Sequence, residues 1–450
     1  MENVARVRLG NDDLGRFDSS AAAAYCALSA MSTRETLEIQ NFGPIRHAHI
    51  DVRDITLLLG PQATGKSLTA QTLYFMRGME ELLVPETWGG GRIPGKSYID
   101  RQELAGKVSG LLANWLGIGG ISYSDTFVSW SLQSEQGSRE DRLELSNKPG
   151  GPGEQARINQ SLAARVDHVD DAARSDSLSM SEEQVYIPAG RMLYSFVPPS
   201  LGMFLLSPRM KQDLLWPGYI NVFYRKLGSA LRSLFDRSRA SNFAPFVDPA
   251  ILEQMSKIMK GKLGFSDPDR ILLSIEDKFA ESEGYSRGFG LDPLKLASGQ
   301  MEQWPFWALV IAAQTEPLAS TRIFFEEPEA HLYPSAQILL TESIAHLTRK
   351  NLRFVLTTHS PYVVYALNNF LMAQQVIDAG GTLPKNRLLQ DTALRRDQVS
   401  AYRFSDSGQV ESIFDEETGL IQTDVLDDPA GELNQLFGEL QTAWLEKQPQ

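Results

Sequence analysis

The residues with the clearest chemical potential form a short loop, Gly60-Pro61-Gln62-Ala63-Thr64-Gly65-Lys66-Ser67. The loop fits the pattern G-x-x-x-x-G-K-[ST], whose backbone N–H groups surround phosphates. In such a loop Lys66 reaches the β- and γ-phosphates of a nucleotide, and the Ser67 hydroxyl binds Mg²⁺. We therefore predict a site for ATP and Mg²⁺. Its phosphate-binding residues are Gly60, Pro61, Gln62, Ala63, Thr64, Gly65, Lys66 and Ser67.

A pair of carboxylates follows an apolar run later in the chain. Ile323-Phe324-Phe325 leads directly into Glu326 and Glu327, and Pro328 then stops the predicted strand. Carboxylates at the carboxyl end of a buried parallel strand lie beside the nucleotide in an open α/β sheet. By position, we expect Glu326 to bind the metal and Glu327 to polarise the attacking water. The alternative is an acidic surface turn, and the apolar residues before the pair argue against it.

Two further segments add candidates with a weaker signal. His359 follows a third strand-like run, Arg353–Thr358. A single histidine is usually structural or exposed, but its place after a strand favours a role in the site. Ser298, Gly299 and Gln300 open a helical pattern, with Ser298 as the predicted N-cap. Because a helix N-terminus attracts anions, we assign these three residues to the nucleotide as well.

Strands and helices must hold these residues together. Ile55–Leu59 reads as a buried strand before the loop, and Ser67–Phe75 reads as a helix after it. A turn between a strand and a helix aims N–H groups and the positive end of the helix at an anion. Since the carboxyl ends of parallel strands share one edge of a sheet, the loop, the carboxylates and His359 are expected to meet there.

Taken together, these motifs resemble those of the ABC-type ATPase superfamily. The loop is similar to its Walker A motif, Leu296 to Gln300 to its signature motif, Ile323 to Glu327 to its Walker B motif with a catalytic glutamate, and His359 to its switch histidine. The resemblance is greatest to the OLD-like and SMC-related AAA-type ATPases of prokaryotes, over the segments Leu37–Ile45, Tyr186–Arg191, Glu326–Pro334 and Thr358–Pro361. Two residues depart from the common pattern, Glu326 in place of Asp and Ala297 in place of Ser.

The resemblance implies an ATPase in which Glu327, His359 and Lys66 are catalytic and Ser67 and Glu326 hold the metal. It implies a homodimer or higher oligomer, with Ser298 of one subunit facing the γ-phosphate on Lys66 of the other. It also implies anti-phage defence or DNA repair with a separate effector such as a nuclease, because this chain looks like the stand-alone ATPase subunits of the PARIS and Septu systems. Nucleic acid or a phage protein is a further candidate partner, and the trigger stays open.

Composition limits the class of protein. The chain has 450 residues, 42% of them hydrophobic, which is enough for a large core. Its formal net charge of −13 argues against non-specific binding to nucleic acid. The single cysteine, Cys26, excludes a disulfide within the chain and suits the cytoplasm. No uncharged stretch reaches the ~18 apolar residues that span a bilayer, so we expect no membrane partner.

Motif spacing and resemblance together predict an α/β fold, an ABC-type P-loop head with a mixed or parallel central sheet and a mainly helical inserted lobe. The predicted parts are an N-terminal arm (1–33), the head with the phosphate loop (34–133), a flexible insertion (134–183), a helical lobe (184–289), the head with the remaining motifs (290–390) and a C-terminal hairpin and helix (391–450). Basic residues gather in 206–262, either as a solvated helix face or as a contact for nucleic acid or a partner.

Two alternatives stay open. The chain could be the nucleotide-binding subunit of a membrane transporter, although its inserted lobe is long and the segment Glu326–Glu329 is atypical of that class. It could also be a scaffold that binds ATP with little turnover, and Glu327 argues against this reading.

Overall fold

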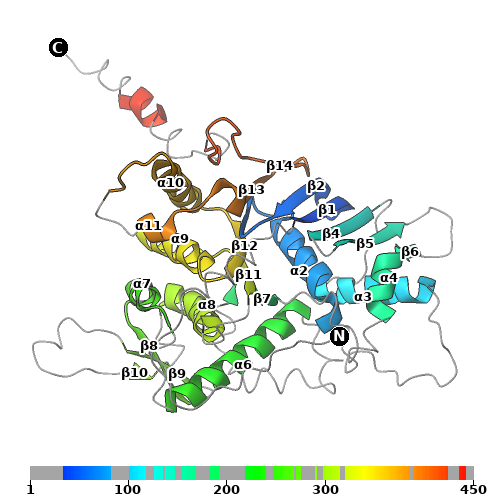
Figure 1. The fold of residues 1–450 in the computed structure, drawn as a ribbon, viewed down its shortest axis with the longest axis horizontal. Helices are drawn as coiled ribbons and strands as arrows, with labels where there is room; N and C mark the ends of the chain where they lie inside the picture. Colours follow the sequence, from blue (N-terminus) through cyan, green and yellow to red (C-terminus); the bar gives the residue numbers. More distant parts are fainter. Residues whose placement is uncertain are drawn as a thin grey trace, which may run out of the picture.

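Three β-sheets organise the part of the chain that the structure describes. The structure is a computed structural model that describes residues 34–82, 101–117, 126–134, 137–146, 155–167, 182–191, 218–239, 247–267, 270–274, 289–290, 297–314, 320–384, 389–423 and 435–441. The predicted N-terminal arm, 1–33, lies outside these residues. The sheets have six, five and three strands. The six-stranded sheet lies at the centre of the molecule, between the five-stranded sheet and a group of helices (Figure 1).

The six-stranded sheet has the order β14-β13-β3-β12-β11-β7 and takes strands from distant parts of the chain. Its strands are β3 (Ile55–Leu59), β7 (Glu183–Ile187), β11 (Thr321–Glu326), β12 (Leu352–Thr358), β13 (Val399–Phe404) and β14 (Val410–Ser412). The neighbours from β13 to β7 pair in parallel, and β14 pairs antiparallel with β13. This confirms the predicted α/β class with a mixed central sheet. The three strands expected to position the site are β3, β11 and β12.

Strands of this sheet are buried on both faces, which explains why β3 and β11 read as continuous apolar runs. Their side chains alternate between two hydrophobic cores. Leu57 and Phe325 belong to one core, and Leu58 and Phe324 belong to the other. Glu326 continues the alternation of Phe324, so its carboxylate points to the same face as that ring.

Helices cover both faces of the central sheet. On the face of Phe324 lies α2 (Lys66–Leu82), which packs together with the five-stranded sheet. The other face is covered by α7 (Pro249–Met259), α8 (Ser298–Gln314), α9 (Pro334–Thr348) and α10 (Pro361–Asp378). α10 begins at Pro361 after the N-cap Ser360, whose side chain accepts a hydrogen bond from the Tyr362 N–H group. This cap fixes the point at which the chain turns after His359.

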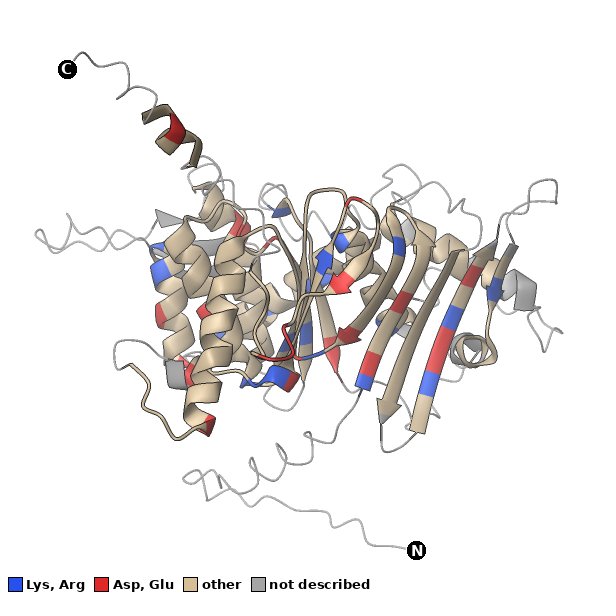
Figure 2. Cartoon of the chain, turned by 90° about the horizontal axis from the view of Figure 1, so that it is seen from above, with Lys and Arg blue, Asp and Glu red and all other residues tan. Residues whose placement is uncertain are grey.

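The five-stranded sheet is antiparallel. Of the segment 134–183, predicted as a flexible insertion, the described residues 137–146, 155–158 and 160–167 form strands and a helix. Its order is β2-β1-β4-β5-β6, with β1 (Arg34–Phe42), β2 (Ile45–Val52), β4 (Thr126–Ser134), β5 (Gly137–Ser146) and β6 (Gln155–Ile158). Two helices accompany it, α3 (Arg101–Leu116) and α4 (Gln160–Asp167). In β5, Leu143 and Leu145 are buried and charged residues alternate with them. Figure 2 shows charges of both signs along these strands. The polar composition therefore belongs to the outer face of a sheet.

The segment predicted as a helical lobe, 184–289, contains strands as well as helices. Its described helices are α6 (Gly218–Arg239) and α7, within the helical pattern of 206–262. β7 belongs to the central sheet, and β8 (Lys262–Asp267), β9 (Arg270–Ser274) and β10 (Phe289–Gly290) form the three-stranded sheet. The strands thus lie at the ends of the segment, where no long periodic pattern signals them.

The C-terminal part returns to the central sheet. α11 (Leu389–Thr392) and a short 3₁₀ helix, η4 (Arg396–Gln398), lead into β13. β13 and β14 form the predicted hairpin, and the Gly408 N–H group donates to the Ser405 carbonyl at 3.0 Å in its turn. Of the predicted C-terminal helix, 435–441 is described and helical. None of the described helices has the length and apolarity to cross a membrane.

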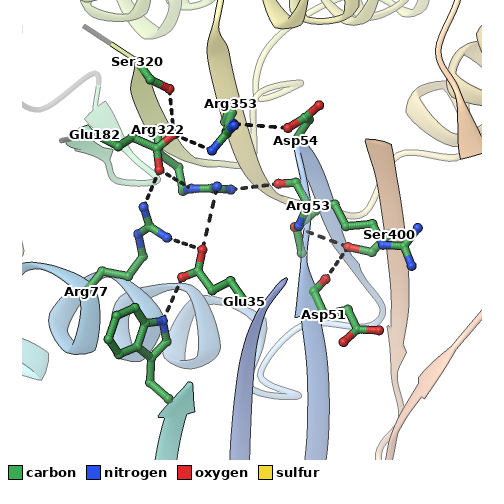
Figure 3. A network of polar contacts seen from close by, with 12 residues as sticks. Glu35, Asp51, Arg53, Asp54, Arg77, Glu182, Ser320, Arg322, Arg353 and Ser400 are labelled. Carbon is green, nitrogen blue, oxygen red and sulfur yellow. Dashed lines mark hydrogen bonds and ion pairs between the residues drawn. The ribbon is translucent and has the colours of Figure 1, made fainter. Parts of the chain in front are cut away.

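Charged side chains form a buried network at the amino ends of the central strands (Figure 3). It joins three arginines to three carboxylates: Arg77, Arg322 and Arg353 to Glu35, Glu182 and Asp54. Glu182 contacts Arg77, and its oxygens lie 3.2 Å from Arg322 Nε and 3.3 Å from Arg353 Nη1. Burial would raise the pKa of Glu182, but the three arginines outweigh burial and lower this pKa to about 2. The network therefore ties α2, β1, β11 and β12 together by charge.

Candidate functional site

The predicted phosphate loop joins the end of β3 to the start of α2, at the carboxyl edge of the central sheet. Gly60, Ala63 and Gly65 have φ angles of 146°, 61° and 106°. A Cβ atom at Gly60 would lie 2.3 Å from the Phe404 carbonyl oxygen, and one at Gly65 would lie 2.6 Å from Ile45 Cγ1. Both glycines are therefore required by backbone conformation and by space. The turn presents the unpaired N–H groups of the α2 N-terminus at this edge.

Lys66 lies within this loop and close to acidic residues. Its side chain is buried, and Nζ donates to the carbonyls of Gly60 at 2.8 Å and Pro61 at 2.5 Å. Burial lowers the pKa of Lys66, and the nearby carboxylates of Glu327 and Glu329 act in the opposite direction. The ammonium group is thus held where a phosphate would meet it, with two carboxylates from another strand in electrostatic range.

Glu326 at the end of β11 is buried and held by neutral donors. Its Oε1 accepts from the Tyr186 hydroxyl at 2.5 Å and from Gln71 Nε2 at 3.3 Å, and its Oε2 accepts from the Ala189 N–H group at 2.8 Å. Burial and Glu326 itself raise the pKa of Tyr186 well above its usual value, so the phenol keeps its proton and donates. Glu326 is therefore fixed in orientation, and Oε2 retains a free lone-pair site.

Glu327, by contrast, has a half-exposed carboxylate and an unusual backbone. Its φ angle is 44°, in the left-handed region that a non-glycine residue seldom adopts. Its N–H group donates to the Thr357 carbonyl at 2.9 Å and lies 3.2 Å from Thr357 Oγ1. Its carboxylate lies 3.6 Å from His359 Nε2. The strained backbone directs this carboxylate towards Lys66 and His359, away from the buried position of Glu326.

His359 is held at the end of β12 by a third glutamate. Glu329 Oε1 accepts from the Thr358 hydroxyl at 2.6 Å and from the His359 N–H group at 2.8 Å. The backbone on which His359 sits is thus fixed by the same acidic segment that carries Glu327. Lys66, Glu327 and His359 therefore come together at one edge, as the spacing of their strands predicts.

The start of α8 is placed differently. α8 begins at Ser298, and the Ala297 carbonyl accepts from the Met301 N–H group at 3.0 Å, so Ala297 and not Ser298 occupies the N-cap position. Gln300 Oε1 accepts from the Ala297 N–H group at 3.0 Å, which is the contact that the third helical residue makes with the N-cap backbone in a capping box. Within the described residues, no hydrogen bond or ion pair joins Ser298, Gly299 or Gln300 to the phosphate loop.

Four residues of the site were not predicted from the sequence. Gln71 and Tyr186 orient Glu326, Glu329 holds the His359 backbone, and Arg191 donates to the carbonyls of both Glu326 and Glu327. Gln71 follows Ser67 by four residues on α2, and this spacing on one helix face was the available signal. Tyr186 and Arg191 lie in a segment that the sequence marks only by its resemblance to OLD-like and SMC-related ATPases. Nothing local in the sequence indicates that β7 lies beside β11.

The residues at this edge fit a nucleoside triphosphate with Mg²⁺. A helix N-terminus and the Lys66 ammonium suit the phosphates. Mg²⁺ prefers oxygen ligands and usually binds through one or two side chains together with phosphate oxygens and water. The half-buried Ser67 hydroxyl and the Oε2 atom of Glu326 are the oxygens available for that purpose. Within the described residues, no group of three or more His, Cys, Asp or Glu side chains could hold a metal alone.

The basic residues of α6 are partly used inside the fold. Lys226 Nζ lies 2.8 Å from Glu183 Oε1. Arg225 and Arg232 are exposed, with Asp236 on the same side of the helix. Blue and red residues are interspersed over the described chain in Figure 2. A nucleic-acid contact on α6 therefore stays a prediction.

Comparison with known protein families finds a similarity in the C-terminal half of the chain. Residues 298–364 match the AAA ATPase domain family. The matched segment contains α8, the Glu326-Glu327 pair and His359. No curated protein sequence matched the chain.

Solved structures of SMC heads and of RecF align with this chain over most of its length. A Smc head bound to the C-winged helix domain of ScpA has 14% identity, a TM-score of 0.40 and coverage of 86% of this chain and 98% of that chain. The SMC head domain from Thermotoga maritima has 11% identity, a TM-score of 0.37 and coverage of 84% and 98%. The recombination mediator protein RecF has 10% identity, a TM-score of 0.37 and coverage of 85% and 98%. The fold class itself rests on the strand order described above.

Proposed function

We propose that this chain binds and hydrolyses ATP as an ABC-type head. The observation that carries the proposal is the meeting of Lys66, Glu327 and His359 at the carboxyl edge of the central sheet, beside the N-terminus of α2. This is where ligands bind in open α/β sheets. The match of residues 298–364 to the AAA ATPase domain family supports the same reading.

Each residue has a distinct task in the proposed reaction. The loop N–H groups and Lys66 hold the β- and γ-phosphates. Ser67 and Glu326 would hold Mg²⁺, which would neutralise charge on the phosphates. Glu327, whose carboxylate is half-exposed, accepts a proton from the attacking water as general base. His359, 3.6 Å from that carboxylate, keeps it aligned and donates towards the γ-phosphate.

The proposed working unit is a dimer of heads around ATP. Ser298 and Gly299 stand at the start of α8 without a contact to the phosphate loop among the described residues of their own chain. Their helix N-terminus favours an anion. In a head-to-head dimer, Ser298 of one subunit would meet the γ-phosphate on Lys66 of the other, so that ATP joins the subunits and hydrolysis releases them.

Mixing two inactive variants tests this arrangement. Ser298→Arg blocks the start of α8, and Lys66→Ala removes the loop cation. Each homodimer should be inactive, whereas a mixed dimer contains one site with Ser298 and Lys66 both intact. Turnover should therefore return to about one quarter of wild type in an equimolar mixture. No recovery, with mixed dimers confirmed by mass, would contradict the shared site, as would turnover strictly proportional to chain concentration at high dilution.

We further propose that the ATPase regulates a separate effector in the cytoplasm, in anti-phage defence or DNA repair. The support is the resemblance of the motif segments to OLD-like and SMC-related ATPases, and to stand-alone ATPase subunits of defence systems. Purification of the Glu327→Gln protein from its host with ATP, followed by mass spectrometry, should recover a nuclease or another effector in fixed proportion. Recovery of integral membrane permease subunits would instead support the transporter alternative.

A further inference from the structure

Arg191, four residues after the end of β7, is a fully buried cation at the carboxyl edge of the central sheet. Its donors go to four main-chain carbonyls: Nε to Glu302 at 2.7 Å, Nη1 to Glu326 at 2.8 Å and to Pro188 at 3.2 Å, and Nη2 to Glu327 at 3.1 Å. The guanidinium carbon also lies 4.6 Å from the centre of the Phe325 ring. One side chain therefore holds the backbone of both predicted acidic residues.

Burial of this cation is costly. Burial lowers the pKa of Arg191 to about 10, and Glu302 is the nearest of the carboxylates that oppose this effect, with Oε2 at 3.4 Å from Nε. A buried ion pair often contributes little or nothing to net stability compared with an apolar replacement. The N–H groups of Arg191 nevertheless donate to the main-chain carbonyls of Glu326 and Glu327, the two predicted acidic residues of the site. Arg191 therefore serves to position the acidic segment more than to stabilise the fold.

The contacts of Arg191 matter most for Glu327, because the backbone of Glu327 is strained. Its left-handed backbone, with φ at 44°, costs on the order of 1–3 kcal/mol and persists only where neighbouring groups over-determine it. Thr357 holds the N–H side of Glu327, and Arg191 holds the carbonyl side. The two contacts act on opposite sides of the strained residue. Together they fix the direction in which the carboxylate leaves the backbone.

The same side chain reaches the start of α8. Glu302, whose carbonyl accepts from Arg191, lies one helical turn after Ser298. The contact is reinforced nearby, because Gln303 Nε2 donates to the Pro328 carbonyl at 2.8 Å. A Cβ atom at Gly299 would lie 2.7 Å from the His331 carbonyl oxygen, so the helix start also packs directly on the acidic segment. The start of α8 and the backbone of Glu327 therefore form one tightly packed unit.

We propose that Arg191 is a positioning residue that sets the direction of the Glu327 carboxylate and couples it to the start of α8. The inference rests on the proposed ATPase function. Arginine suits this task because its planar guanidinium offers five donors in a fixed fork, which a lysine ammonium does not reproduce. A group that occupies the α8 N-terminus, such as a γ-phosphate, would then act on the base through Glu302 and Arg191.

Arg191→Lys tests the proposal against a matched control. The control is Arg322→Lys, which changes another buried arginine on the same sheet, at the opposite ends of the strands and without contact to Glu326 or Glu327. Both variants should melt earlier than wild type. Arg191→Lys should bind MgATP with nearly wild-type affinity and lose roughly 10- to 100-fold in kcat, the usual cost of a misplaced catalytic group. Arg322→Lys should keep the wild-type kcat per folded molecule.

A double-mutant cycle with Glu327→Gln then separates position from stability. If Arg191 acts through Glu327, the Arg191→Lys change should have almost no effect on the residual turnover of Glu327→Gln protein. Equal loss in both backgrounds, or equal kcat losses in Arg191→Lys and Arg322→Lys, would overturn the proposal. Wild-type protein without ATP turnover would instead overturn the ATPase function itself.

A second variant keeps the test decisive if Arg191→Lys does not fold. Glu302→Gln is nearly isosteric and removes the carboxylate beside Arg191 Nε while the Glu302 carbonyl stays in place. It should lower kcat by roughly 3- to 10-fold with unchanged MgATP affinity, because the guanidinium loses its nearest counter-charge. Wild-type kcat in a folded Glu302→Gln protein would count against the coupling.

Discussion

The two ends of the parallel strands hold similar charged residues and use them in opposite ways. At the amino ends, Arg77 and Arg322 meet Glu35 and Glu182 in a buried network whose charges neutralise one another. At the carboxyl ends, Lys66 and Glu327 lie close together without a direct ion pair between them among the described contacts. Both keep hydrogen-bonding capacity for another molecule. The first arrangement fixes the fold, and the second can carry out chemistry.

The difference lies in what each charge is bound to. Glu182 is held by three arginine side chains, which lower its pKa to about 2 although burial alone would raise it. Glu327 is held by its main chain, through Thr357 and Arg191, and its carboxylate stays half-exposed. A carboxylate that is fixed by its backbone keeps its oxygens available. The site therefore depends on backbone geometry, whereas the network depends on the pairing of side chains.

The largest expected effect is on turnover in Glu327→Gln. The amide keeps the size and polarity of the side chain but is no longer a base, so kcat should fall by about 10²- to 10⁴-fold with MgATP binding retained. Phosphate release measures kcat, and calorimetry measures binding. The matched control is Glu182→Gln at the opposite edge, which should keep the turnover of the folded molecule. Similar kcat losses in the two variants would remove the distinction between the two ends.

The same control variant should show the reverse pattern in stability. Glu182→Gln leaves Arg322 and Arg77 buried with too few counter-charges, so its free energy of unfolding should fall by about 3–5 kcal/mol. Glu327 is half-exposed, and among the described residues the charged contact of its side chain is the one with His359 at 3.6 Å, so Glu327→Gln should change stability by less than about 1 kcal/mol. Urea unfolding of both variants measures this. A stable Glu182→Gln protein would show that the network is not needed for the fold.

The pH dependence of stability should report the amino-edge network. The pKa of Glu182 is about 2 in the fold, below the reference value of 4.5. Its stabilising contribution is therefore complete above pH 4.5 and is lost as the pH falls from 4.5 towards 2. The loss should be on the order of 3 kcal/mol. Unfolding at several pH values should show this slope in wild type and a shallower one in Glu182→Gln. If the free energy of unfolding depends on pH in the same way in both proteins, the loss of stability at low pH does not come from Glu182.

The smallest expected effect concerns the phosphate loop. Ala63 has a φ angle of 61°, which glycine adopts at less cost, so Ala63→Gly should stabilise the fold by up to about 1 kcal/mol or leave it unchanged. Gly65→Ala is the matched opposite change, since its Cβ would lie 2.6 Å from Ile45 Cγ1 at a φ of 106°. It should lower the melting temperature and ATP affinity together. Equal stability of the two variants would argue that the loop tolerates other backbone conformations.

Three strands of the central sheet could be predicted from the sequence because each contains an apolar run that leads into a recognisable residue. β3 leads into the phosphate loop, β11 into Glu326 and β12 into His359. Their shared edge follows from the rule that parallel strands end together. The hairpin of β13 and β14 was also readable, from its turn residues.

The remaining features depend on contacts between distant parts of the chain. β5 was hidden because its charged outer face dominates the local composition. The roles of Tyr186 and Arg191 depend on the pairing of β7 with β11, which joins segments more than a hundred residues apart. Glu182 and Arg322 form their ion pair for the same reason. Local periodicity carries no information about such pairing, so only a three-dimensional structure reveals these residues.

Equilibrium binding of ATP shows whether the carboxyl edge of the central sheet is a nucleotide site. Isothermal titration of purified protein with ATP and Mg²⁺ should show one ATP per chain. In Lys66→Ala the affinity should fall by about 10- to 100-fold, the cost of one strong charge-assisted contact to phosphate. Wild-type protein that binds no ATP, or a folded Lys66→Ala protein that binds it as tightly as wild type, would rule out a nucleotide site built on Lys66 at this edge.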